Sequence, residues 1–146
     1  MSDPDPKVVK QVLAELRHHN KDTRRTAVMK LGMMGGDEAV RMLMLIVTDN
    51  TEDLIVRGRA ALMLGKMGDV RAVGPLIRAL DAPGYQTPLY AAQSLGQLGD
   101  PRAIPPLVRM LRTDHDRFRQ AALVSLAKLG YNPEAPVLEP EAEGEA

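Results

Sequence analysis

The stretch that decides the fold is Val56–Arg78, which reads VRGRAALMLGKMGDVRAVGPLIR. It holds the end of one apolar helix, a turn of sequence LGKMG at residues 64–68, and the start of a second helix with a proline near its beginning. The turn recurs as LGQLG at 95–99 and LAKLG at 126–130, and an earlier copy reads LGMMG at 31–35. The chain is therefore an internal repeat, and repeated glycines of this kind indicate helix C-caps rather than a phosphate-binding loop.

The spacing of these copies locates the one irregularity of the repeat. The anchor leucines at positions 64, 95 and 126 are 31 residues apart, whereas the step from position 31 to position 64 is 33 residues. The two extra residues fall in the polar segment Thr48–Asp53. A stacked array absorbs length changes in its loops, so the insertion supports the repeat assignment.

Each copy predicts an outer helix followed by an antiparallel inner helix. A two-helix unit of this size cannot bury its apolar face alone, so stacking is required. We therefore predict an all-α fold, a right-handed α-solenoid (an α-α superhelix of the armadillo or HEAT-like kind) of four two-helix repeats. Residues 1–6 are expected to be a flexible lead-in, 7–130 the repeat domain, and 131–146 a disordered acidic tail rich in proline and glutamate. The predicted inner helices span about 23–34, 55–67, 88–98 and 117–129.

The composition restricts the class of protein. Hydrophobic residues make up 45% of the 146 residues but aromatic residues only 3%, as expected for close packing of Ala, Leu, Val and Met between helices. Nineteen basic and nineteen acidic residues cancel, which disfavours a dedicated nucleic-acid binder. The chain has no cysteine, so disulfides, thiolate metal sites and Cys nucleophiles are excluded. Without a long apolar run or a signal peptide, we expect a cytoplasmic protein with no membrane partner.

One repeat carries a resemblance to a known family. Its pattern is Val56-Arg57-x-x-Ala60-Ala61-x-x-Leu64-Gly65-x-Met67-Gly68-Asp69-x-Arg71-Ala72-Val73-x-Pro75-Leu76-Ile77-x-x-Leu80. This pattern closely resembles the HEAT-like repeat of the phycobilisome (PBS) lyase type, over about residues 7–130. That family includes bilin lyase subunits, regulatory scaffolds and many adaptors, so the resemblance implies a fold more than a particular function.

An arginine recurs seven residues before the anchor leucine. Seven residues are almost two helical turns, which places this position in the buried arc of the inner helix. A buried guanidinium needs acceptors, and the carboxylates of Asp69 and Asp100 or loop carbonyls can supply them. We therefore predict a structural ladder between repeats, with a substrate-binding arginine as the alternative. The ladder residues are Arg24, Arg57 and Arg119 with Asp69 and Asp100, and Pro88 interrupts the ladder in the third repeat.

No catalytic constellation accompanies the repeats. His18, His19 and His115 fall in turns, without a set of ligands at convergent spacing. Some HEAT-like hydroxylases hold iron with His-Glu steps on their helices, but this chain has no His-Glu dipeptide. We therefore expect no enzyme activity of its own, no cofactor and no metal.

The outward-facing positions of the inner helices form the candidate site. On a helical wheel they lie away from the core, and stacking aligns them in a concave strip. The strip combines an apolar seam (Met29, Leu62 and Val124) with one tyrosine and with basic and amide side chains, a combination typical of protein-binding surfaces. Its residues are Arg25, Met29, Met33, Arg59, Leu62, Lys66, Tyr90, Gln93, Gln97, Gln120, Val124 and Lys128.

The leading hypothesis is a non-enzymatic scaffold or adaptor that binds a peptide, helix or acidic loop of another protein on this strip. The family resemblance also allows a bilin-lyase-like accessory or a chromophore chaperone. A weaker alternative is nucleic-acid binding through the basic edges of the strip. A homodimer through the terminal repeats (Val8 and Val12 of the first helix) and masking of the strip by the acidic tail also stay open.

Overall fold

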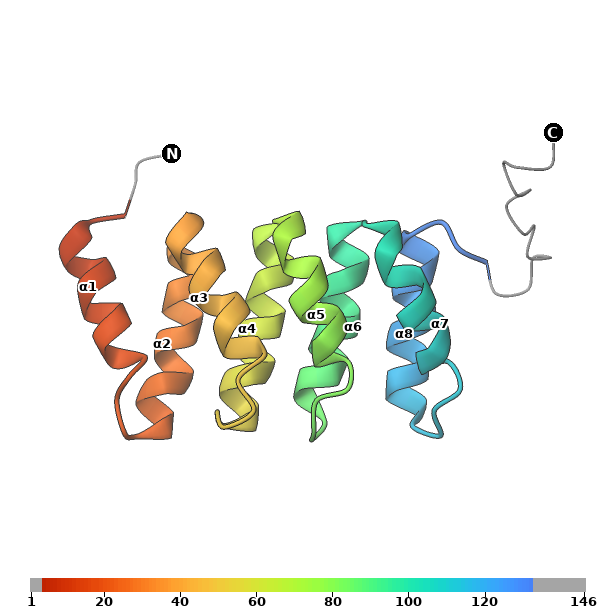
Figure 1. The fold of residues 1–146 in the computed structure, drawn as a ribbon, viewed down its shortest axis with the longest axis horizontal. Coiled ribbons are helices and arrows are strands. Elements are labelled where there is room, and N and C mark those ends of the chain that lie inside the picture. Colours follow the sequence, from red (N-terminus) through yellow and green to blue (C-terminus); the bar gives the residue numbers. More distant parts are fainter. Residues whose placement is uncertain (1–3, 133–146) are drawn as a thin grey trace.

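The structure is a computed structural model that describes residues 4–132. Its α-helices follow one another as four hairpins, and 3-10 turns precede two of the outer helices (Figure 1). The first two hairpins are α1 (Pro6–Glu15) with α2 (Lys21–Met34), and α3 (Asp37–Val47) with α4 (Leu54–Met67). The last two are η1 (Val70–Ala72) and α5 (Val73–Ala79) with α6 (Gln86–Leu98), and η2 (Pro101–Ala103) and α7 (Ile104–Met110) with α8 (Asp116–Lys128).

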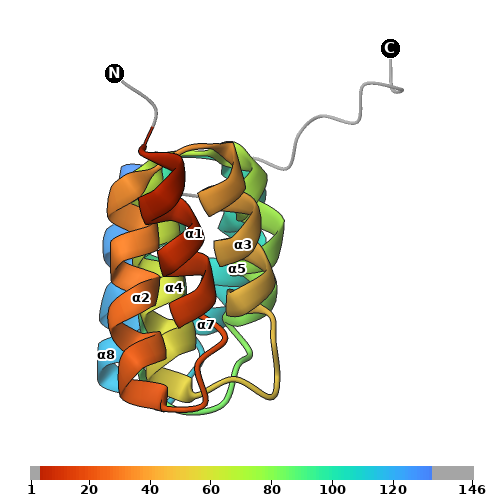
Figure 2. The same cartoon turned by 90° about the vertical axis from the view of Figure 1, so that its left-hand side faces the viewer.

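The hairpins build two layers. The inner helices α2, α4, α6 and α8 stand side by side along the stack, and the outer helices α1, α3, α5 and α7 form the second layer (Figure 1). Figure 2 looks along the stack and shows α2 and α8 on one side and α3 and α5 on the other. Residues 4–132 contain no strand, so the predicted all-α solenoid of two-helix repeats is confirmed. In this part of the chain no helix has the length and apolarity needed to cross a membrane.

Capping residues fix where the helices begin and end. The Asp53 carboxylate accepts hydrogen bonds from the backbone N–H groups of Ile55 and Val56 at the start of α4. Gly68 closes the same helix in the left-handed conformation, with φ of 71°. Such a positive φ favours glycine, which explains why the turn glycine recurs in each repeat.

Proline in the third outer helix is explained by a late helix start. Pro75 is the third residue of α5, which begins at Val73 after the 3-10 turn η1. The first backbone N–H groups of a helix have no partner within it, so the missing N–H of proline costs no helical hydrogen bond there. The fourth outer helix has the same arrangement with Pro106.

The anchor leucines and the residues around them form the core between repeats. Leu64, Leu95 and Leu126 are fully buried. The glycines after Leu64 and Leu95 lie against the next inner helix, so that a Cβ on Gly96 would lie 2.8 Å from the Cα of Ser125. The Ser125 hydroxyl donates a hydrogen bond of 2.6 Å to the Ala92 carbonyl. The preceding interface repeats this arrangement with Gly65, Ser94 and Ala61.

The two faces at the ends of the described stack differ from these interfaces. In the first repeat, the position of the stacking serine is Lys30, which is exposed and pairs with Glu15 at 3.4 Å. In the fourth repeat, the glycine after the anchor is replaced by Ala127. Three residues before that anchor, Leu123 is 47% exposed, whereas its counterpart Ala92 is fully buried.

The boundaries of the predicted domain shift slightly. Pro6 already belongs to α1, and the side chain of Asp5 caps that helix by accepting from the Lys7 N–H, so the lead-in is shorter than predicted. Tyr131, predicted to begin the tail, packs against the core, and its N–H donates to the Leu126 carbonyl at 2.9 Å. The remaining predicted tail, 133–146, lies outside the described residues.

Candidate protein-interaction surface

Part of the predicted strip lies in a groove between α6 and α8. Its volume is about 370 Å³. Three strip residues, Gln93, Gln120 and Val124, line it, and Val124 is 50% exposed. The remaining lining residues are Tyr85, Leu89, Arg117 and Ala121. The groove thus combines an apolar floor with amide groups and one guanidinium, and its lining contains no carboxylate. We refer to these seven residues as the α6–α8 groove.

An aromatic cluster at one end of the groove holds Tyr85 in place. The Arg117 Nη1 donates a hydrogen bond of 2.7 Å to the Tyr85 hydroxyl, and its guanidinium carbon lies 5.7 Å from the centroid of the Tyr85 ring. Phe118 stacks on Tyr85 at 5.9 Å and on His115 at 4.2 Å, measured between ring centroids. Pairs of this kind contribute about 0.5–1.5 kcal/mol beyond the burial of their area. The Tyr85 side chain is therefore held in a fixed orientation.

The exposed tyrosine predicted for the strip is Tyr90 and not Tyr85. Tyr90 is half-buried and packs against the core, so it is not the exposed tyrosine that was predicted. Tyr85 precedes α6 and lies outside the helical periodicity, which is why a helical wheel misses it. A signal was available, since Tyr85, His115 and Phe118 all fall at the same end of neighbouring hairpins.

Arg25 and Arg59, the two arginines of the predicted strip, both bind groups within the protein. Arg25 forms a two-pronged ion pair with Asp53, with Nε–Oδ2 at 2.8 Å and Nη2–Oδ1 at 3.0 Å. Arg59 donates to the backbone carbonyl of Arg25 at 3.0 Å. Both side chains therefore connect the first two repeats, and the Asp53 carboxylate balances the charge of Arg25.

The Arg25–Asp53 pair predicts a stability difference that depends on pH. The hydrogen bond from Arg25, together with those from the helix N-terminus, lowers the pKa of Asp53 from 3.8 to about 2. A lowered carboxyl pKa adds stability that is present above pH 4 and disappears as the pH falls through 2. We expect Asp53→Asn, which keeps a capping oxygen, to lose about 1 kcal/mol at pH 7 after screening by solvent. Urea denaturation should show this gap closing between pH 4 and pH 2; a constant gap would mean that the cap, not the ion pair, is responsible.

The other strip residues divide into exposed and half-buried groups. Met33 is 80% exposed, the highest value among the large apolar residues of the described chain. The polar side chains Lys66, Gln97 and Lys128 are also exposed. Met29 and Leu62 are half-buried, so these two residues of the predicted apolar seam are less exposed than Val124.

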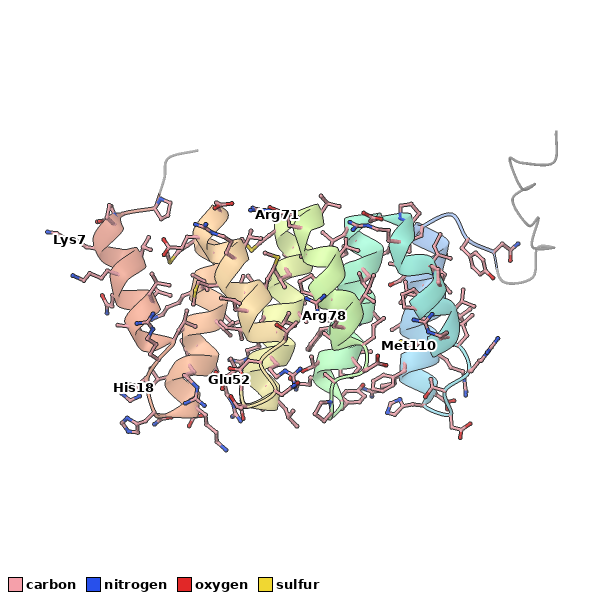
Figure 3. The ribbon with its side chains drawn as sticks, in the orientation of Figure 1. Lys7, His18, Glu52, Arg71, Arg78 and Met110 are labelled. Carbon is pink, nitrogen blue, oxygen red and sulfur yellow. The ribbon has the colours of Figure 1, made fainter. Side chains whose placement is uncertain are left out.

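Of the two kinds of acceptor predicted for the arginine ladder, the structure uses carbonyls and not the carboxylates of Asp69 and Asp100. Asp69 and Asp100 cap the 3-10 turns and pair with Arg71 and Arg102, each at 2.8 Å. The recurring arginines bind loop or helix-end carbonyls of their own hairpin: Arg24 those of His18 and His19, Arg57 that of Val47, and Arg119 that of Thr113. Only Arg24 also reaches the next repeat, through Glu52 at 3.0 Å, which Figure 3 shows beneath α3.

In the third repeat the ladder position is occupied by proline. Pro88 is buried, and the neighbouring Thr87 hydroxyl donates to the Leu54 carbonyl at 3.2 Å. The Thr87 hydroxyl thus links the third repeat to the second, whereas the recurring arginines bind carbonyls within their own hairpins.

The histidines of the described chain do not assemble a metal site. His18 and His19 stack on each other with centroids 4.4 Å apart, and the His18 Nδ1 accepts from the Asn20 N–H. No group of three or more His, Cys, Asp or Glu residues within 4–132 is arranged to hold a metal ion.

Val12, predicted as a contact of a homodimer, is 3% exposed and packs in the core, which leaves only Val8 of that pair accessible.

Comparison with solved structures identifies similar folds. The chain superposes on a chain of the complex of CpcE and CpcF of phycocyanin lyase from Nostoc sp. PCC7120 with a TM-score of 0.73 and 27% identity, covering 89% of this chain and 55% of that one. It also matches the crystal structure of an engineered protein with a TM-score of 0.61 and 19% identity, covering 84% and 62%. The chain thus spans less than two thirds of either neighbour. No curated protein sequence matches it.

The sequence itself matches a family model twice. The model describes HEAT repeats, and it matches residues 9–87 and 75–143. The matches cover most of the chain and agree with the four stacked hairpins. The chain belongs to the HEAT-repeat family.

Proposed function

We propose that this HEAT-repeat chain is a non-enzymatic scaffold that binds another protein over the outward face of its inner helices, with the α6–α8 groove as the main contact. The observation that carries the proposal is the groove itself, about 370 Å³, with a fixed tyrosine beside half-exposed Val124. Rigid aromatic and arginine side chains around an apolar floor are typical of the few residues that dominate binding energy.

The charge of the groove favours an amphipathic segment with an acidic residue. Arg117 is exposed and binds the neutral Tyr85 hydroxyl rather than a carboxylate. Leu89, Ala121 and Val124 offer apolar contact beside it. A helix or peptide that places an apolar side chain over Val124 and a carboxylate toward Arg117 would match both features.

A charge introduced into the groove should abolish the interaction. We expect Val124→Glu to reduce binding of the partner at least tenfold, because it places a carboxylate in the apolar contact. Leu45→Glu is the matched control, since Leu45 is 66% exposed on the outer helix α3. The measurement is affinity capture from the native cell, with quantitative mass spectrometry of the proteins retained by each variant, followed by calorimetry with the protein so identified.

Circular dichroism should show the same helix content for both variants. A partner that wild type, Val124→Glu and Leu45→Glu all retain equally would contradict the groove as the contact site. The cytoplasmic location expected from the sequence stays a prediction, and captured cytoplasmic proteins would support it.

A second candidate is a lyase-type accessory role, which the similarity to the CpcE and CpcF chains supports. In that case the chain would contact a chromophore or the protein that carries it. A visible-absorbance titration with a free bilin distinguishes the two candidates, because the scaffold alone should leave the bilin spectrum unchanged.

A further inference from the structure

The second repeat contains a buried arginine with one unpaired nitrogen. Arg57 is 3% exposed, and both its Nε and its Nη2 donate to the Val47 carbonyl at 3.2 Å. Its Nη1 has no hydrogen-bond partner, and it is the only such buried side-chain nitrogen or oxygen in the described chain. A buried polar group left unpaired costs about 1–3 kcal/mol, and more when it is charged. This nitrogen therefore favours any acceptor that can reach it.

Arg57 differs from its counterparts in the carbonyl that it binds. Arg24 donates to carbonyls five and six residues before it, and Arg119 to the carbonyl six residues before it. Arg57 instead reaches ten residues back, to the carbonyl of Val47 at the end of α3. The segment Thr48–Asp53, which contains the two extra residues, lies between them.

A pocket beside Arg57 adds a second guanidinium from the next repeat. Its volume is about 240 Å³, and its lining residues are Val47, Thr48, Asn50, Arg57, Arg78 and Ala79. Arg78 lies on the outer helix α5, where Figure 3 labels it, and it is exposed. It forms no ion pair within 4.0 Å among the described residues, so its charge is available to a ligand.

The lining of this pocket carries positive charge without a carboxylate of its own. Asp49 lies between the lining residues Thr48 and Asn50, and its carboxylate accepts from the Thr51 hydroxyl at 2.6 Å and from the Thr51 N–H at 2.9 Å. These bonds lower the pKa of Asp49, and the charge of Arg57 lowers it further. The Asp49 carboxylate thus stays ionised and bound to Thr51 of its own loop. Asn50 contributes a carboxamide to the pocket.

We propose that this pocket binds an oxyanion, a carboxylate or phosphate group held between Arg57 and Arg78. A guanidinium presents N–H groups in a planar fork that matches two oxygens of such a group. The bonds that the Arg57 Nε and Nη2 donate to Val47 fix its guanidinium and leave Nη1 for the oxyanion, whereas Arg78 supplies charge from the next repeat. The pocket involves α3, α4 and α5 and shares no residue with the α6–α8 groove, so this proposal stands independently of the proposed function.

The test is a titration of the full chain with inorganic phosphate, and separately with acetate, at constant ionic strength. Two-dimensional ¹H–¹⁵N NMR should show saturable shifts of Thr48 and Asn50 and of the Arg57 Nε–H. The probe that saturates at the lower concentration identifies the oxyanion as phosphate or carboxylate. We expect Arg78→Gln to weaken the apparent affinity about tenfold, because it removes one of the two cations.

Arg109→Gln is the matched control. Arg109 occupies the position of Arg78 one repeat later, but the residue corresponding to Arg57 there is Pro88. We expect it to leave the affinity unchanged, and we expect Arg57→Lys, which keeps a charge but loses the fork, to weaken binding like Arg78→Gln. Equal loss with Arg109→Gln and Arg78→Gln would overturn the proposal, as would shifts that fail to saturate with both anions. Arg78→Gln and Arg109→Gln change exposed residues, so they test the proposal even if Arg57→Lys alters the fold.

Discussion

Gly96→Ala is expected to destabilise the protein by about 2 kcal/mol, although alanine is the better helix former. The new Cβ would lie 2.6 Å from the Ser125 Oγ and 2.8 Å from the Ser125 Cα. The second of these is a backbone atom, so a side-chain rotation cannot relieve the contact and α6 and α8 must separate. Overpacking of this kind costs about 1–3 kcal/mol, and separation also lengthens the bond from Ser125 to the Ala92 carbonyl.

Gly74→Ala is the control for helix propensity. Gly74 lies within α5, and apart from its chain neighbours a Cβ there meets only the Arg78 Nη1, at 3.8 Å. The helix propensity of alanine favours the substitution by about 0.5–1 kcal/mol, but Pro75 disfavours the helical conformation of a preceding residue that carries a Cβ, so the two effects oppose each other. Chemical denaturation with urea should therefore show a clear loss for Gly96→Ala and little change for Gly74→Ala. If the two variants were equally stable, the close approach of α6 and α8 would be refuted.

Leu95→Ala should have the largest effect of any truncation, a loss of about 3–5 kcal/mol. Leu95 is fully buried at the centre of the inner layer, where it belongs to the core shared by the repeats. Removing its methyl groups loses the transfer energy and leaves a cavity that rigid helices on both sides cannot fill. Because each repeat is stabilised mainly by its neighbours, the truncated third repeat would then couple the folding of the second and fourth repeats only weakly.

Denaturation followed by circular dichroism measures this loss. The expected midpoint falls steeply for Leu95→Ala, and the transition broadens as the two halves lose cooperativity. Leu45→Ala provides the comparison, since Leu45 is 66% exposed and its truncation should change stability by less than about 0.5 kcal/mol. Similar losses for both variants would show that burial does not determine the contribution of these leucines.

The repeat spacing predicted the architecture because it depends on helix geometry alone. The recurring anchor at 64, 95 and 126 fixes one buried position per inner helix, and the loop insertion in the second repeat leaves that register unchanged. The same reasoning correctly predicted that Arg57 is buried. It could not say which carbonyl accepts its hydrogen bonds, because the path of the preceding loop, and not the helical wheel, decides which carbonyl lies within reach.

The binding surface was predicted less completely, for a related reason. A wheel describes one helix in isolation, whereas neighbouring repeats cover its flanks. Tyr90 illustrates this, because the wheel places it on the exposed side of its helix but its side chain packs against the core. Arg25 also points outward, yet it finds Asp53 across the repeat boundary. Val124 lies in the last described helix, and there the predicted exposure agrees with the structure.

The outward faces of the first and fourth described repeats disfavour stacking of one copy of this chain on another. Head-to-tail growth in the internal register would place Lys30 of one molecule against Ala127 of the next. The Ala127 methyl group would then occupy the space that glycine leaves free at the internal interfaces. The Lys30 ammonium opposite it would have to lose its hydration. Open-ended addition of identical units generates fibres, and these two side chains obstruct it without any change to the repeat itself.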